Sequence, residues 1–146
     1  MRFSFRFAST LVAVGSFAAA ALATEMKYPK TLEQYEMVRS GLAADELASA
    51  KNGATNLVTA VQEEFGGSKA MIDASQQLAA SESLDDARAA FGVISAELTK
   101  VVQGQPGFYV MNCPMVKNGT WVQTVPKISN PYMGKKMLEC GEIVKK

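Results

Sequence analysis

The sequence contains no histidine among its 146 residues, and it has only two cysteines, one tryptophan and five prolines. Histidine is the side chain that most often transfers protons or activates a nucleophile near neutral pH, so the commonest acid–base and nucleophile arrangements are excluded. The two cysteines, Cys113 and Cys140, do not form a C-x-x-C pair, and the sequence has no phosphate loop or dinucleotide fingerprint. We therefore expect a protein that is not an enzyme.

A long hydrophobic run is also lacking, and the one apolar stretch has another explanation. Arg2 and Arg6 precede an uncharged run from residue 7 to residue 22, and Ala21–Ala23 forms an A-x-A cleavage site. This is the pattern of a secretory signal peptide over residues 1–23. Because the run is short for a bilayer and no other segment is longer, we expect no membrane span after the signal peptide is cleaved.

Neither sign of charge dominates the chain. Cleavage removes two of the 15 basic residues and none of the 14 acidic ones, so the net charge changes from +1 to −1. Such a chain has no strong electrostatic attraction for nucleic acid or for an anionic membrane. The remaining residues, 24–146, suffice for a single small domain with a modest core.

Residues 24–103 carry four stretches with helical periodicity. Each follows a residue that often caps a helix, namely Thr31, Asp45, Ser68 or Ser83. Apolar residues then recur three or four positions apart, as on the buried side of a bundle helix. The expected stripes are Tyr35, Val38 and Leu42; Leu47, Ala50, Ala54, Leu57, Val61 and Phe65; Met71, Ala74 and Leu78; and Leu84, Ala87, Phe91, Ile94, Leu98 and Val101. The sequence thus predicts a mainly α fold built on an antiparallel four-helix bundle.

Two residues inside these helices differ from the pattern. Gly53 lies within the second stretch, where a small residue lets two helices approach closely. Arg88 adjoins the fourth stripe and could pair with an acid on a neighbouring helix. Because most such charges are exposed, we expect Arg88 to be a solvated surface residue.

Residues 104–146 have a different, irregular composition that predicts a small C-terminal lobe. Asn118-Gly119 is a strong turn signal between two short runs of strand-forming residues, so we expect a β-hairpin of 109–116 against 120–125. Asn130-Pro131 resembles a helix start, which predicts one short helix from Pro131 to about Cys140.

Sulfur is concentrated in this lobe. Cys113 and Met115 stand two residues apart on the predicted strand and would project to the same side of the sheet. Met133, Met137 and Cys140 would share one side of the predicted helix. Thiolates and thioethers select Cu(I) or Ag(I) over harder ions, so these five residues are candidate metal ligands. Zinc fits less well, because its structural sites usually take four Cys or His ligands.

A disulfide between Cys113 and Cys140 is the alternative. The loop that they enclose has about 28 residues, and closing it would stabilise the fold by roughly 3.6 kcal/mol in the chain-entropy description. Paired cysteines are common in exported proteins, and methionines fill irregular gaps in cores. Residue chemistry alone leans towards the disulfide, and a thioether site for Cu(I) or Ag(I) could coexist with it.

The C-terminal motifs resemble those of a known family. Cys113-Pro114-Met115, Trp121-Val122-Gln123, Asn130–Gly134 and Met137–Gly141 together look like a small periplasmic domain of uncharacterised function. That domain occurs alone or fused to the periplasmic adaptor (membrane-fusion) subunits of copper/silver efflux systems. Family members often have histidine where this chain has Asn112, and an aromatic residue where it has Met133. The first difference removes an imidazole and the second adds a thioether.

The resemblance implies a periplasmic location and a role in handling Cu(I) or Ag(I), with a periplasmic efflux adaptor or another envelope protein as partner. The candidate ligands are the five sulfur-bearing residues singled out by their chemistry, namely Cys113, Met115, Met133, Met137 and Cys140. The alternative function is that of a disulfide-stapled structural or docking module that binds another envelope protein without metal.

Overall fold

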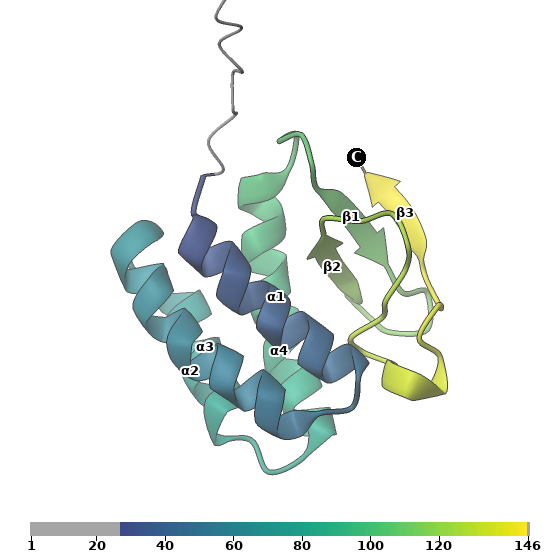
Figure 1. The fold of residues 1–146 in the computed structure, drawn as a ribbon, viewed down its shortest axis with the longest axis horizontal. Helices are drawn as coiled ribbons and strands as arrows, with labels where there is room; N and C mark the ends of the chain where they lie inside the picture. Colours follow the sequence, from purple (N-terminus) through teal and green to yellow (C-terminus); the bar gives the residue numbers. More distant parts are fainter. Residues whose placement is uncertain (1–26, 146) are drawn as a thin grey trace, which may run out of the picture.

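The computed structural model describes residues 27–145, which fold into a mainly helical protein with a small antiparallel sheet (Figure 1). The predicted signal peptide lies outside these residues. The elements in chain order are α1 (Pro29–Ala43), α2 (Leu47–Glu64), α3 (Lys69–Ala80), α4 (Leu84–Val102), β1 (Tyr109–Asn112), β2 (Thr120–Gln123), the 3₁₀ helix η1 (Gly134–Lys136) and β3 (Glu142–Lys145). The prediction of a mainly α protein with four helices is confirmed.

Each helix packs against the next along the chain, and α1 and α2 also contact α4. The predicted stripes form the core, except that Leu47, Phe65, Leu84 and Val101 are only partly buried near helix ends. Gly53 permits the close approach of α2 to α1, because a Cβ atom there would lie 3.0 Å from the backbone nitrogen of Val38. The prediction that Gly53 lets two helices approach closely is therefore confirmed.

The helix starts agree with the sequence only in part. Ser83 caps α4 as expected, its Oγ accepting a hydrogen bond from the Asp86 amide at 3.1 Å, and α3 begins directly after Ser68. Thr31 was a wrong choice for α1, which begins at Pro29. The first amides of α1 are capped instead by Glu64 at the end of α2. The Glu64 carboxylate accepts hydrogen bonds from the Lys30 and Thr31 amides at 3.1 and 2.9 Å.

The sheet has the strand order β2-β1-β3, with both pairs antiparallel. Val110 lies opposite Val122 in β2, and Met111 lies opposite Ile143 in β3. The strands are shorter than predicted, because the chain turns back immediately after β1: the Val116 amide donates to the Cys113 carbonyl at 3.2 Å. Strand β3 was not predicted at all.

The predicted helix from Pro131 to Cys140 is wrong. Only the short 3₁₀ helix η1 forms there, between turns. Gly134 has a φ of 54°, a left-handed conformation that interrupts a right-handed helix. The following amide, that of Lys135, donates to the side chain of Asp45 at 3.1 Å instead of to a carbonyl one turn back.

An aromatic cluster joins the helices to the sheet. The rings of Tyr35 and Phe91 stack at 5.4 Å, and Tyr132 contacts both Phe91 and Trp121. The Tyr35 hydroxyl bonds Ser95 at 2.9 Å and accepts from the Val122 amide at 3.0 Å. The lobe and the helices therefore share one continuous core.

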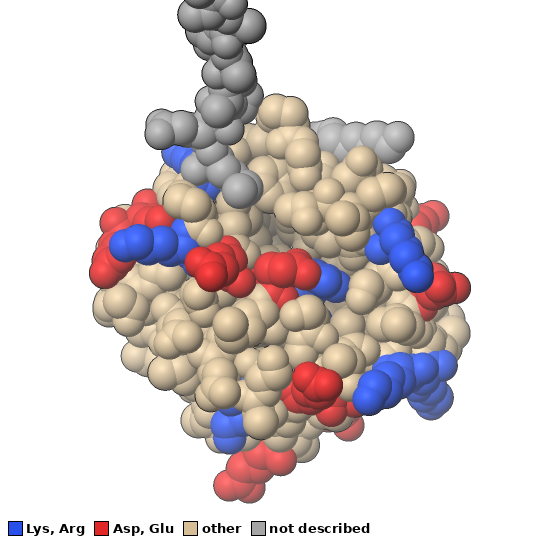
Figure 2. Space-filling view, in the orientation of Figure 1, with Lys and Arg blue, Asp and Glu red and all other residues tan. Residues whose placement is uncertain are grey.

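The surface carries both signs of charge. Figure 2 shows Lys and Arg side chains interspersed with Asp and Glu on this side of the molecule, with uncharged surface between them. Within residues 27–145, no helix has the length and apolar character needed to cross a membrane.

Candidate functional site

The two cysteines meet at the junction between β1 and β3. Cys113 directly follows β1, and Cys140 stands two residues before β3. Because these strands pair, with Asn112 opposite Glu142, the two Sγ atoms come to within 3.8 Å of each other. The predicted proximity of the thiols is present, although the strand that produces it was not anticipated.

The two thiols differ sharply in exposure. Cys113 is wholly buried in the core, whereas Cys140 is partly exposed and follows an exposed stretch of chain from residue 135 to residue 139. Both are free thiols in the structure, since a disulfide requires about 2.05 Å between the sulfurs. Partial burial, together with the neighbouring Cys113 thiol, raises the pKa of Cys140 above that of an ordinary cysteine.

Asn130 positions the segment that carries Cys140. Its side chain is fully buried, and its Nδ2 donates to the Cys140 carbonyl at 2.6 Å. Its Oδ1 accepts from the Tyr132 and Met133 amides at 2.8 and 3.1 Å. Sequence reasoning found the capping role of Asn130 but assigned it to a helix that does not form.

Trp121 lies against the residue that follows Cys140. The indole is fully buried, and its Nε1 donates to Gln123 at 2.8 Å. A Cβ atom on Gly141 would lie 2.7 Å from the indole Cη2, so only glycine fits at this position. Trp121 is thus a core anchor that fixes the backbone next to Cys140.

The three candidate methionines occupy different environments. Met115 is 66% exposed although Cys113 is buried, so the expected common side of a strand is wrong: β1 ends before both residues. Met133 is partly buried and packs against the core. Met137 is 39% exposed, and its carbonyl accepts from the Cys140 amide at 3.0 Å. The expectation that Met133, Met137 and Cys140 share one side of a helix is also wrong, since that helix is absent.

Arg88 connects three parts of the fold, and the expectation of a solvated surface charge is wrong. Its side chain is only 15% exposed and forms an ion pair with Asp45. Its guanidinium also donates to the Pro131 carbonyl at 2.9 Å and to the Leu42 carbonyl at 3.1 Å. Asp45 was predicted to cap α2, but the capping position belongs to Glu46.

The electrostatic environment of Asp45 reflects this contact. Desolvation acts to raise the pKa of its carboxyl, but hydrogen bonds from Arg88 and from the Lys135 amide outweigh it and hold the pKa below its ordinary value. The sequence signal for Arg88 was its position beside the apolar stripe of the fourth predicted helix.

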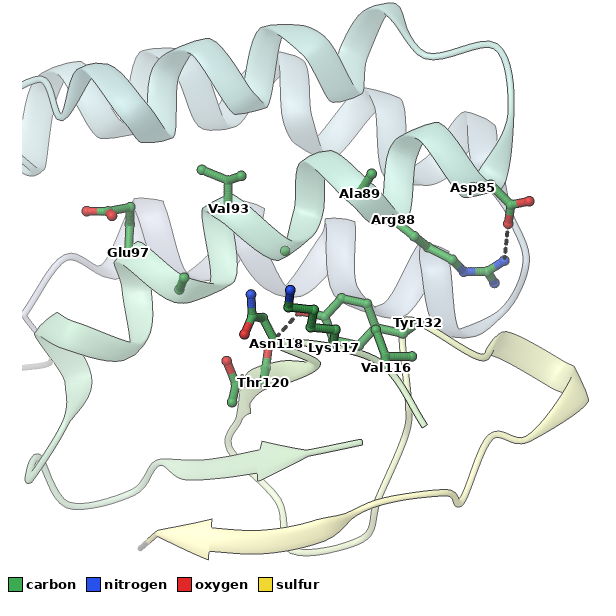
Figure 3. A pocket seen from close by; sticks show the side chains of 12 residues that line it. Asp85, Arg88, Ala89, Val93, Glu97, Val116, Lys117, Asn118, Thr120 and Tyr132 are labelled. Carbon is green, nitrogen blue, oxygen red and sulfur yellow. Dashed lines mark hydrogen bonds and ion pairs between the residues drawn. The ribbon is translucent and has the colours of Figure 1, made fainter. Parts of the chain in front are cut away.

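A groove of about 710 Å³ runs between α4 and the turn that joins β1 to β2. Figure 3 shows α4 on one side, the turn that carries Lys117 and Asn118 on the other, and Tyr132 between them. Small and apolar residues of α4 line much of it, including Ala89, Gly92 and the 45% exposed Val93. Sequence reasoning did not find this groove, because its two walls are distant in the chain.

Among residues 27–145, no three or more Cys, Asp or Glu side chains gather closely enough to hold a metal ion. Comparisons with family models, with curated proteins and with solved structures give no significant match.

Proposed function

We propose that this protein is an exported, periplasmic accessory that binds Cu(I) or Ag(I) through Cys113 and Cys140 and serves metal efflux. The observation that carries the proposal is the approach of the two thiol sulfurs to 3.8 Å. Soft thiolate ligands favour these monovalent ions. The resemblance of the C-terminal motifs to a domain found with copper/silver efflux adaptors gives the same metal class.

The separation of the sulfurs suits a shared ion. Two sulfurs 3.8 Å apart can each bond an ion at about 2.3 Å, a typical zinc–sulfur length, with a sulfur–metal–sulfur angle of roughly 110°. An angle of that size leaves room for a third ligand. Met137 is the best-placed thioether, because a single hydrogen-bonded turn joins it to Cys140. Met133 and Met115 remain candidate ligands.

The exposed side of the site favours exchange of the ion with a partner. Cys140 and Met137 both reach the surface, while Cys113 closes the site from within. The protein would therefore buffer the ion or transfer it to a periplasmic adaptor, as a binding protein and not as an enzyme.

We also propose that the four helices form an antiparallel bundle and that β1 and β2 form the expected hairpin, as their contacts support.

An anaerobic titration of the reduced protein with Cu(I) against a competing chelator tests the metal proposal. We expect one tightly held ion, and we expect it to be lost in Cys113→Ser and in Cys140→Ser. Met137→Leu should weaken binding, whereas Met37→Leu should not. Met37 is a matched control, because it is 37% exposed but lies on α1. Failure of the reduced protein to retain copper would sink the proposal.

The groove favours a second candidate, a disulfide-stapled module that docks another envelope protein and binds no metal. Its apolar lining and the exposure of Val93 suit the apolar side of a partner helix. A thiol count on protein taken from the oxidising compartment tests the staple. Two stable free thiols would contradict this candidate, and their absence together with no copper binding would favour it.

A further inference from the structure

We propose that Cys140 is a thiol-exchange site: it reacts first with the disulfide of another molecule, and the buried Cys113 then resolves the mixed disulfide. The exchange itself does not require metal binding. Its consequence, that oxidation closes the Cu(I) or Ag(I) site, rests on the function proposed above.

The first step is argued from the unequal exposure of the two cysteine residues. A disulfide must reach the attacking sulfur, and Cys140 is partly exposed next to the exposed residues 135–139. Cys113 is fully buried, and its amide donates to the Gly119 carbonyl at 2.8 Å, which fixes its backbone in the turn after β1. Attack by Cys113 on an external disulfide would require local opening of the lobe.

Proximity of the sulfurs carries the second step. Once Cys140 holds a foreign thiol, its sulfur lies about 3.8 Å from that of Cys113 in the arrangement seen here. That is near the distance at which reacting atoms approach for attack. A short movement at Cys140 closes the bond, and Cys113 can remain in the core.

The chemistry balances with a low-molecular-weight or protein disulfide as the oxidant. The Cys140 thiolate, having lost its proton to solvent, attacks one sulfur of the external disulfide, and the other sulfur leaves with the electron pair and takes up a proton. The Cys113 thiolate then attacks the Cys140 sulfur and expels the second foreign thiolate, which is also protonated. The protein dithiol is oxidised by two electrons, and one external disulfide is reduced to two thiols.

The test mixes the metal-free, reduced protein with an aromatic disulfide whose released thiol absorbs light. Wild type should release two equivalents of thiol and finish with no adduct in its mass spectrum. Cys113→Ser should release one equivalent and keep a stable adduct. Cys140→Ser should react at least about tenfold more slowly, because its remaining thiol is reached only through local opening. Equal rates for the two variants, or a wild-type protein that retains two adducts, would overturn the proposal.

A second measurement covers the case in which a variant does not fold. Limiting alkylation of reduced wild type, followed by peptide mass spectrometry, should label Cys140 before Cys113. The reverse order would also overturn the proposal. One equivalent of Ag(I) should block the exchange, and an unchanged rate with Ag(I) would disprove the link to metal while leaving the exchange itself intact. Failure of exchange in protein that binds copper would reject this inference alone.

Discussion

Asn130 holds the segment around Cys140 through a single buried amide. It donates to the Cys140 carbonyl and accepts from the Tyr132 and Met133 amides. Because the residue is fully buried, water cannot replace these bonds without an opening of the lobe. The position of the partly exposed thiol therefore depends on a residue ten positions earlier in the chain.

Replacing Asn130 should loosen this segment. We expect Asn130→Ala to lower the free energy of unfolding by about 2–3 kcal/mol, because buried amides and a carbonyl lose their partners. Urea unfolding measures the loss, and alkylation of Cys140 in the reduced protein should become faster. Asn130→Asp keeps the acceptor but places a buried carboxyl oxygen against the Cys140 carbonyl, so we expect no smaller loss at neutral pH. An unchanged urea midpoint in the alanine variant would refute this role.

The first helix depends on a residue from the second. Glu64 accepts from two amides in the first turn of α1, in the place of a cap from its own sequence. Partial desolvation acts to raise the pKa of this carboxyl, but the bonds from the Thr31 and Lys30 amides outweigh it and lower the pKa. A distant acid thus fixes the relative position of two elements.

Glu64→Gln should destabilise the protein by about 1 kcal/mol at neutral pH, within the range for a lost helix cap. Because the folded-state pKa is lowered, the carboxylate stabilises the fold fully above its unfolded pKa, near 4.3, and this contribution is lost as the pH falls through the folded pKa. The difference between wild type and variant should therefore disappear in acid.

The matched control for this cap is Glu63→Gln. Glu63 forms an exposed ion pair with Lys30, and such pairs contribute little to stability. Thermal unfolding of the two variants between neutral and acidic pH compares them directly. Equal losses in both variants would show that α1 is not capped by Glu64.

The elements differ in how far sequence predicts them. Helices α2, α3 and α4 follow from local periodicity, and the capping serine of α4 is visible in the sequence. Strand β3 was missed because its partner β1 lies some thirty residues earlier, and only long-range pairing makes it a strand. The helix predicted after Asn130 had a good start signal, but it does not form. Gly134 is in a left-handed conformation, and the Lys135 amide donates to the Asp45 side chain.

The candidate site shows the same limit. Chemistry alone singled out the two cysteines, and their approach was expected. The different environments of Met115, Met133 and Met137 were not predicted, because they depend on where the strand and the helix end. The ion pair between Asp45 and Arg88 was not predicted, because each side chain contacts groups from other elements, which no local pattern reveals.

At the scale of the whole molecule, the Asp45–Arg88 pair fastens the C-terminal lobe to the helices. Arg88 on α4 bonds the carbonyls of Leu42 and Pro131, and Asp45 accepts from the Lys135 amide. Both side chains are partly buried, so solvent screens their attraction less than that of an exposed pair. The orientation of the thiol-bearing segment relative to the helices depends on this joint.

A double-mutant cycle with Asp45→Asn and Arg88→Met measures the joint. We expect a coupling energy of about 1 kcal/mol, as for other pairs within one hydrogen-bonded network. The exposed pair Lys69–Asp73 on α3 is the control and should couple by less than about 0.5 kcal/mol. Hydrogen exchange of amides 130–141 should rise in Arg88→Met. Coupling no larger than that of the control would argue against the joint.

The contact between Trp121 and Gly141 has an optical consequence. This indole is the protein's one tryptophan, and it lies in a buried position against the residue next to Cys140. Its emission therefore comes from a single, defined place, and a change at the neighbouring sulfur alters the surroundings of the emitting ring. The molecule thus contains an intrinsic fluorophore beside its thiol pair, so the metal loading and the oxidation proposed above can be tested by fluorescence without attaching a label.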